Sequence, residues 1–553
     1  MQQPILILGA GINGAAIARE FLLNRIGVCL VDSADLASGT TAFSSRLIHG
    51  GLRYLEYGEF DLVRESLAER RRLLRLAPQF VRPLRLHVPV SSRASGFLQA
   101  ATNFLRLGKE RRRRSRRGLW LVQLGLWLYD TTARTEGLEK RATHLVDDAG
   151  VPQVNCREYS WLCSYMDAQI AFPERLVVAM LRDCQSLANR FEVPFELLTY
   201  RQAARRGDTI ELTDAKGKVE AELRPPAIVN ATGAWVDRTL QRLNLASPRL
   251  IGGTKGSHLL TFNESLRRML GGQGVYVEAA DGRPVFVLPL GDATLVGTTD
   301  VVYEAPPETA VASEGELDYL LSTSNALFPE AKLSRDDIHL HYCGVRPLPF
   351  AGDTKPSAIT RRHALHEHQA ADPPLFSVIG GKLTTCRSLA EETVQHVLGR
   401  LGQSVEADSR ERLLPGAEGF PDNSGDVTRE QERLAVAVGV TREQIQAVWA
   451  LCGTETQQML GAAPTGPDEN LAGTQLPLRF VRRVIQDEWV VHLSDLVERR
   501  LMLLYDRGLT ATALHQLAGL LAEEGVFGRE QIESEVTACQ NRLATHFGRQ
   551  VDE

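Results

Sequence analysis

Several protein classes are excluded by what the chain lacks. Its eight cysteines are scattered over 553 residues without a C-x-x-C pair, a distribution that lacks metal or iron–sulfur ligand spacing and favours reduced thiols. The longest mostly apolar run, residues 119–129, has eleven residues and is interrupted by Gln123 and Gly125. A membrane-spanning helix needs about 18 or more such residues. The formal net charge of −5 argues against wholesale nucleic-acid binding.

The N-terminus lacks the marks of export. The stretch "MQQPILILGAG" has no basic region and no cleavage site, so we expect no signal peptide and a cytoplasmic protein. What the chain does have is length and an ordinary composition, with 43% hydrophobic and 24% charged residues. At about 100–200 residues per domain, it should fold into roughly two to four domains.

A nucleotide-binding turn lies at residues 4–32. An apolar strand leads into Gly9, Gly11 and Gly14, a helix follows, and a second strand ends in Asp32. The glycines have G-x-G-x-x-G spacing, which permits a tight turn, close approach to a pyrophosphate and close helix–strand packing. The helix directs its positive end at that pyrophosphate, and Asp32 is placed to bind a ribose. The motif predicts a dinucleotide site but does not separate NAD from FAD.

Three later segments each end a predicted strand in small or polar residues. They are "IVNATGAW" with Thr232 and Gly233, a hairpin over 284–300 that turns at Gly291-Asp292 and ends at Asp300, and 375–401, where Gly380, Gly381 and Lys382 precede a helix. Reduction of a flavin places negative charge on one edge of its ring, and a glycine-preceded helix N-terminus would stabilise that charge. A plain structural turn is the alternative, but with the opening motif the pattern favours a discontinuous flavin-binding fold.

Four cations stand on turns rather than on amphipathic helix faces. Arg53 lies in "RLIHGGLRYLE", Arg346 precedes Pro347, Arg361 follows a short β-like run, and Lys382 follows two glycines. Taken singly, each is more often a solvated charge than a ligand. Together they indicate convergence on a doubly charged group such as a phosphate monoester, for which the planar guanidinium group is suited.

The motifs together carry a family resemblance. "GAGINGAAIARE", "SSRLIHGGLRYLE", "VNATGAWVD", "VGTTDVVY", "LSRDDIHLHYCGVRPL", "AITR" and "IGGKLTT" occur in order between residue 4 and about residue 400. They resemble the FAD-dependent glycerol-3-phosphate dehydrogenase family, and the region after "LLPGAEG" resembles its helical cap more loosely. The resemblance implies an α/β fold with a discontinuous Rossmann-like FAD-binding domain, an antiparallel-sheet substrate domain and an α-helical C-terminal domain.

The resemblance also implies an activity and a set of site residues. Members of the family oxidise sn-glycerol 3-phosphate to dihydroxyacetone phosphate and pass the electrons to a membrane quinone. By motif, Arg53, Arg346, Arg361 and Lys382 would hold the phosphate and the reacting oxygen, with His49 and Tyr54 near flavin and substrate. The implied FAD contacts are Gly9, Gly11, Gly14, Asp32, Ser44, Ser45, Thr232, Gly233, Asp300, Gly381, Lys382, Leu383 and Thr384.

A catalytic hypothesis follows from these positions. The fixed phosphate would bring the C2 hydrogen of the substrate to flavin N5 while a neighbouring base accepts the hydroxyl proton. His49 is the predicted base, because an unperturbed histidine pKa of about 6.5 suits that task. His49 could instead only form a hydrogen bond to the flavin or its loop, and Arg346 could steer the alkoxide.

Residues 88–145 match the family poorly. Eight lysines and arginines fall within 106–117, and the apolar run 119–129 carries Trp120, Trp127 and Tyr129. Basic residues beside an aromatic-rich apolar helix are typical of a segment that binds an anionic membrane surface. A solvated loop followed by a core helix, or a basic run that recruits RNA, are the alternatives. We expect a peripheral protein on the inner face of the cell membrane.

The expected division assigns four parts. They are an FAD-binding domain (1–87, 146–250 and 340–402), a membrane-interface insert (88–145), a substrate-binding sheet (251–339) and a helical domain (405–553) with Thr428 and Thr441 as helix caps. The helical domain shows no catalytic constellation and suits a structural role, as a homodimer contact or a membrane contact. Three alternatives remain open: an oxidase that releases hydrogen peroxide, a flavin-binding scaffold without turnover, and an amine-oxidising relative.

Overall fold

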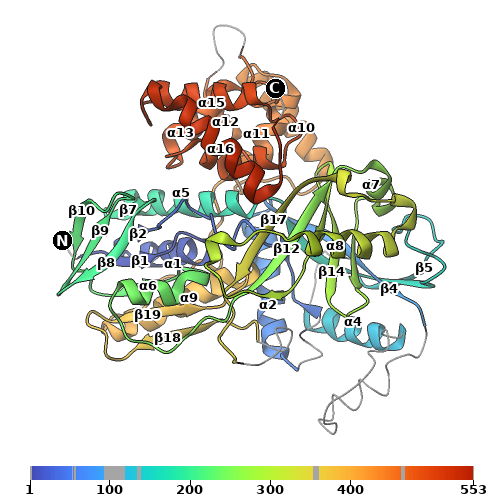
Figure 1. The fold of residues 1–553 in the computed structure, drawn as a ribbon, viewed down its shortest axis with the longest axis horizontal. Coiled ribbons are helices and arrows are strands. Elements are labelled where there is room, and N and C mark those ends of the chain that lie inside the picture. Colours follow the sequence, from blue (N-terminus) through green and yellow to red (C-terminus); the bar gives the residue numbers. More distant parts are fainter. Residues whose placement is uncertain are drawn as a thin grey trace.

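The described residues form three β-sheets: two large ones side by side, with a cap of helices over them, and a small antiparallel one of β8 (Gln202–Arg206), β9 (Thr209–Thr213) and β10 (Val219–Leu223) (Figure 1). The structure is a computed structural model that describes residues 3–52, 54, 58–92, 119–133, 139–352, 360–462 and 468–551. Arg53 and the basic run 106–117 lie outside the described residues.

The first sheet is the predicted nucleotide-binding sheet. Its six strands have the order β18 (Ala364–His368), β19 (Leu375–Ile379), β11 (Ile228–Asn230), β1 (Ile5–Leu8), β2 (Val28–Val31) and β7 (Phe195–Leu198). All pairs from β19 to β7 are parallel. Their side chains are almost fully apolar because helices α1 (Ile12–Leu23), α5 (Pro173–Phe191) and α9 (Cys386–Arg400) pack beside this sheet. The strand–turn–helix prediction at the N-terminus is confirmed.

A second sheet of ten strands stands beside the first. The main path is β16 (Val301–Val302), β12 (Thr254–Thr261), β15 (Ala293–Gly297), β14 (Pro284–Leu290), β13 (Gly274–Glu278), β4 (Val81–Val90), β6 (Trp161–Ile170) and β3 (Leu47–Ile48), with β17 (Ile338–Arg346) on β12 and β5 (Ala142–Leu145) on β6. The pairs are antiparallel except β4 with β13. The hairpin that turns at Gly291-Asp292 is confirmed.

The sheets divide the chain differently from the expected domains. Strand β6 and most of β4 and β17 fall in the segments assigned to FAD binding, and all three pair within the second sheet. The reason is long-range: β4 pairs with β6, about 80 residues further along the chain, and with β13, still further on. A local pattern carries no information about such partners.

Helices cover both faces of the second sheet. On one face, α7 (Glu264–Leu270) and α8 (Glu314–Leu327) share an apolar cluster with the strands. On the other, α2 (Phe60–Leu76) and α4 (Leu119–Ala133) pack against β4, β6 and each other. Within the described residues, no helix is long and apolar enough to cross a membrane.

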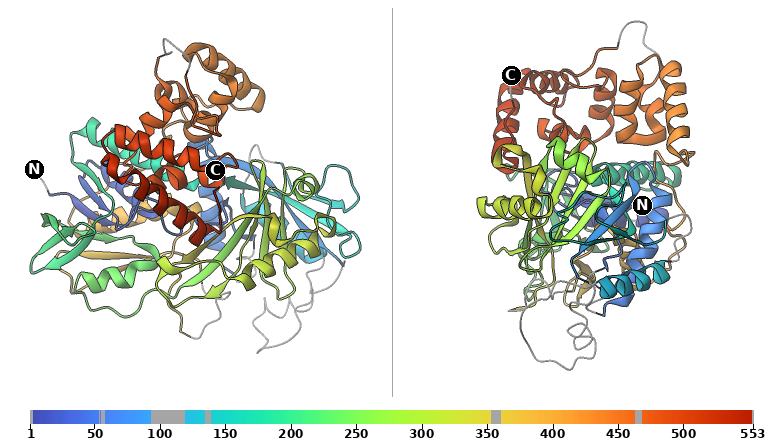
Figure 2. Two further views of the ribbon diagram at one scale, coloured as in Figure 1. Left: turned by 45° about the horizontal axis from the view of Figure 1, so that its top comes forward. Right: turned by 90° about the vertical axis from the view of Figure 1, so that its right-hand side faces the viewer.

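The C-terminal region is helical, as predicted, and lies at the opposite end of the molecule from α2 and α4 (Figures 1 and 2). Its main helices are α10 (Ser424–Val438), α11 (Arg442–Cys452), α13 (Leu478–Asp487), α15 (Ala511–Glu523) and α16 (Ile532–Phe547). Thr441 caps α11 as predicted, with Gln444 completing a capping box. The prediction for Thr428 is wrong, because Asn423 already caps α10 five residues before it.

Candidate active site

A cavity of about 700 Å³ opens where the strands of the first sheet end. Gly9 lies in its wall with a φ of +102°, and a Cβ there would come within 2.7 Å of the Ala231 carbonyl oxygen. A Cβ on Gly14 would stand 1.8 Å from the Gly9 carbonyl oxygen. Only glycine fits either position, so the turn brings bare backbone and the N-terminus of α1 to the cavity.

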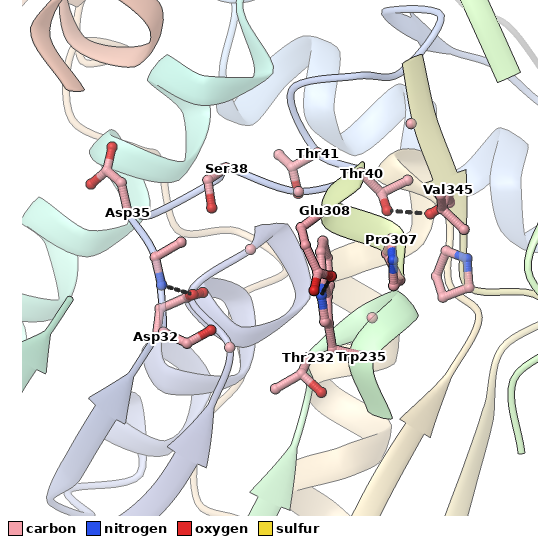
Figure 3. A pocket seen from close by; sticks show the side chains of 18 of the residues that line it. Asp32, Asp35, Ser38, Thr40, Thr41, Thr232, Trp235, Pro307, Glu308 and Val345 are labelled. Carbon is pink, nitrogen blue, oxygen red and sulfur yellow. Dashed lines mark hydrogen bonds between the residues drawn. The ribbon is translucent and has the colours of Figure 1, made fainter. Parts of the chain in front are cut away.

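Asp32 occupies the cavity wall at the end of β2 (Figure 3). Its carboxylate accepts hydrogen bonds from the peptide N–H groups of Ala10 at 2.7 Å and Ala34 at 2.9 Å. Burial raises its pKa to about 6, although both hydrogen bonds oppose the shift. A carboxylate fixed in this way can accept hydrogen bonds from ribose hydroxyl groups, as the sequence predicted.

The loop after β2 forms a second wall. Ser38, Thr40 and Thr41 present hydroxyl groups there, and Thr40 donates to the Val345 carbonyl oxygen at 2.7 Å (Figure 3). Seven further predicted cofactor residues also line the cavity: Gly11, Ser44, Thr232, Gly233, Gly381, Lys382 and Leu383. The cavity thus has groups that suit a dinucleotide. The bare backbone, the hydroxyl groups and the helix N-terminus suit its phosphates, and the Asp32 carboxylate suits its ribose.

Of the other cofactor residues predicted, Gly14, Ser45, Asp300 and Thr384 are outside the described lining of this cavity. Gly14 packs the turn, and Thr384 accepts a hydrogen bond from the His49 peptide N–H at 3.1 Å. Ser45 Oγ lies 2.9 Å from Nε2 of His258. Asp300 lies among the cations described next.

Two arginines meet on one carboxylate. Arg346 Nη1 donates to Asp300 Oδ1 at 3.1 Å, and Arg361 Nη2 lies 3.6 Å from Asp300 Oδ2. Arg346 is held further by the Thr298 hydroxyl and the Thr299 carbonyl oxygen. Nη1 of Arg361 is buried and has no hydrogen-bond partner among the described residues. A buried guanidinium donor without a partner suits an anionic ligand.

Lys382 joins the cavity to this cation group. Its Nζ lies 4.0 Å from the centre of the Tyr54 ring and donates to Ser66 Oγ at 3.1 Å. Burial lowers the pKa of Lys382 to about 7, against the opposing charges of Glu59 and Glu65. Burial also lowers the pKa of Arg346, and the charge of Arg361 lowers the pKa of Lys382 and Arg346 further. Arg346, Arg361 and Lys382 thus form one electrostatic group, with Tyr54 beside it.

His49 stands next to the second sheet, with its ring 6.4 Å from that of Phe286. Burial lowers its pKa to about 4, and the nearby charge of Asp167 opposes the shift. The following peptide N–H, that of Gly50, donates to the Tyr129 hydroxyl at 2.9 Å. His49 is therefore neutral at pH 7, whereas a histidine with an unperturbed pKa of about 6.5 would be partly protonated there.

Sequence reasoning missed two features of the site. His258 on β12 is stacked on Tyr342 at 4.9 Å, and its Nδ1 is buried with no partner in the described ranges. Burial and then Arg346 hold the pKa of His258 well below its ordinary value. The second feature is the C-terminal domain, which supplies part of the cavity wall. Neither has a local sequence signal.

Comparisons with known proteins agree with this geometry. Residues 4–387 match the FAD dependent oxidoreductase family. A glycerol-3-phosphate dehydrogenase of Synechocystis is 32% identical over 92% of this chain and 91% of its own. A D-erythritol 1-phosphate dehydrogenase of Brucella abortus is also 32% identical, over 90% of this chain and 93% of its own.

A solved structure shares the fold. The glycerol-3-phosphate dehydrogenase of Bacillus halodurans, complexed with FAD, superposes with a TM-score of 0.70 at 21% identity, over 99% of this chain and 95% of that one. The cofactor of this chain is FAD, which the cavity fits in its backbone, hydroxyl and carboxylate groups. The protein belongs to the FAD-dependent oxidoreductase family and, within it, to the glycerol-3-phosphate dehydrogenases.

Proposed function

We propose that the protein oxidises sn-glycerol 3-phosphate to dihydroxyacetone phosphate and passes the electrons to a membrane quinone. The observation that carries the substrate assignment is the buried cation group. Arg346 and Arg361 share Asp300, Lys382 lies close by, and Nη1 of Arg361 is unpartnered in the described part of the chain. A phosphate monoester carries about −1.5 to −2 charges at pH 7 and can satisfy such donors.

The arrangement supports distinct roles for these side chains. Bound FAD supplies the hydride acceptor. Arg346, Arg361 and Lys382 hold the phosphate and the reacting oxygen, which fixes the substrate carbon against the cofactor. Arg53, by motif, joins them. Tyr54 packs below the Lys382 ammonium group.

His49 is the proposed general base. Burial keeps its imidazole neutral, with a pKa of about 4, so the ring is in the form that accepts a proton from the C2 hydroxyl group. The low pKa makes the protonated product of that step unfavourable, and the Asp167 charge offsets part of this. Arg346 steers the developing alkoxide.

Anaerobic mixing with the substrate tests this assignment. Loss of flavin absorbance is expected with sn-glycerol 3-phosphate and not with glycerol, which lacks the phosphate. D-erythritol 1-phosphate is the second candidate substrate, because a dehydrogenase for it is as similar to this chain as the glycerol-3-phosphate enzyme. Faster bleaching with the erythritol compound would reassign the substrate. Unchanged flavin with both phosphates would refute the proposal.

The membrane part of the proposal rests on α4. Trp120, Leu124 and Trp127 follow one another on a single helical face and are 62%, 55% and 49% exposed, whereas Val122 and Tyr129 are buried. Three large apolar side chains on one exposed face are suited to the headgroup boundary of a membrane. Docking of this kind at the cytoplasmic face would bring the flavin site to a quinone dissolved in the lipid.

Flotation with anionic liposomes tests the docking. Replacing Trp120 and Trp127 together by glutamate should abolish binding. Val436→Glu is the matched control, because Val436 is an exposed apolar residue on α10 at the far end of the molecule. Equal binding by both variants would contradict the proposal. Reoxidation of the reduced protein by quinone, and by air with hydrogen peroxide detection, separates a dehydrogenase from an oxidase.

A further inference from the structure

The C-terminal domain forms one side of the FAD cavity. Six of its side chains lie in the cavity wall: His492, Ser494, Arg499, Arg542, His546 and Phe547. They face the same space as Gly9, Gly11 and Asp32 of the nucleotide turn. The C-terminal domain is therefore part of the cofactor cavity and not only a surface addition to the fold.

The C-terminal domain forms ion pairs with one end of the loop that follows β2, residues 33–46. Asp35 is buried at that end, and Arg500 donates to both of its carboxylate oxygens at 2.6 and 2.8 Å. Arg499 donates to the same carboxylate at 2.5 Å and also pairs with Asp495 and Glu498. Asp35 itself lines the cavity beside Asp32 (Figure 3).

The other end of this loop is held as well. Arg46 is buried, with a φ of +55°, and pairs with Glu174 on α5 at 2.8 Å. It also donates to the hydroxyl of Tyr505, and its guanidinium carbon lies 4.4 Å from the centre of the Tyr505 ring. Tyr505 belongs to the C-terminal domain. The side chains that face the cofactor, from Ser38 to Ser44, therefore lie between two anchors to that domain.

These contacts resist separation for a physical reason. Moving the loop away from the domain would separate Asp35 from both arginines and leave Arg500 without a carboxylate partner among the described residues, and an unpaired buried charge is strongly destabilising. The loop can leave its position only if the domain moves with it. A ligand that needs the loop in place is then thermodynamically linked to the docked domain, and each stabilises the other.

We propose that the C-terminal domain is the cofactor-retaining part of the protein: Arg500, Arg499 and Tyr505 are positioning residues that hold the loop 33–46 against FAD. The alternative is that the same ion pairs only dock one domain on another. The two alternatives predict different rates of FAD release when a contact of Arg500 or Tyr505 is weakened, and this rate can be measured without substrate.

The test uses the FAD-loaded protein and two conservative variants. Tyr505→Phe removes only the hydroxyl group that meets Arg46, and Arg500→Lys keeps the charge but loses the two-pronged contact with Asp35. The rate of FAD release is followed after dilution by the rise in free flavin fluorescence. Release should be about tenfold faster for Tyr505→Phe, which loses one hydrogen bond to a guanidinium group, and faster still for Arg500→Lys.

Arg182→Gln is the matched control. Arg182 on α5 pairs with Glu455 of the C-terminal domain at 2.6 Å, so it belongs to the same domain contact but not to the loop. The proposal would be overturned if both anchor variants released FAD at the wild-type rate. It would also be overturned if Arg182→Gln released FAD as fast as the anchor variants. If Arg500→Lys does not fold, Tyr505→Phe decides the matter alone. Circular dichroism at the release temperature separates cofactor loss from unfolding, because helices should persist after FAD has left the anchor variants.

Discussion

Replacing Arg361 by glutamine isolates the phosphate-binding role of the cation group. The substitution keeps a hydrogen-bond donor but removes the charge that faces Asp300 Oδ2 at 3.6 Å and the unpartnered Nη1. A hydrogen bond to a charged group contributes roughly 1.5–3 kcal/mol. The kcat/KM for sn-glycerol 3-phosphate should therefore fall by about 10- to 150-fold, since every 1.4 kcal/mol is about tenfold.

Stopped-flow reduction of the flavin divides this loss between affinity and rate. The phosphate is remote from the C–H bond that breaks, so the apparent Kd should rise more than the limiting rate falls. Arg362→Gln makes the same charge change at the neighbouring, exposed position and should stay within about twofold of wild type. An apparent Kd for sn-glycerol 3-phosphate that stays at the wild-type value in Arg361→Gln, or that rises equally in Arg362→Gln, would contradict a phosphate-binding role for Arg361.

Three further predictions concern charge, packing and capping. Because the pKa of Lys382 is lowered to about 7, its ammonium charge is lost as pH rises through that value. The pH profile of kcat/KM should fall there, and Lys382→Arg should remove the fall. Gly14→Ala places a Cβ 1.8 Å from a backbone oxygen and should lose bound FAD, whereas Gly315→Ala meets open space and should keep its absorbance spectrum. Thr441→Ala should lower the free energy of unfolding by about 1 kcal/mol in urea titrations, and Thr428→Ala by much less.

The first sheet was predictable because its signals are local. Four buried residues, a glycine turn and a helix follow one another within about twenty positions. The residues from Ile5 to Leu23 are therefore enough to predict this strand, turn and helix. The second sheet was predictable only where strands adjoin, as at Gly291-Asp292. The pairing of β4 with β6 depends on residues brought together by the rest of the chain, and no local pattern marks it.

The site divides in the same way. Arg346, Arg361 and Lys382 could be named because each stands beside a proline, a short run or a glycine pair, and the structure brings the three together. The role of Asp300 as their shared carboxylate could not be read, since the sequence pointed it at the cofactor. His258 and the cavity wall from the C-terminal domain were missed because proximity in space left no pattern along the chain.

The carboxylate of Asp300 also bears on how the protein turns over. The substrate and product of the proposed reaction carry the same phosphate group, so a charge that binds one would also slow the release of the other. Under the proposed function, Asp300 would neutralise part of the paired guanidinium charge and fix its geometry in advance, and so would weaken phosphate binding without disturbing the alignment of the substrate. A pocket of this kind would have a lower affinity for the substrate and a faster release of the product.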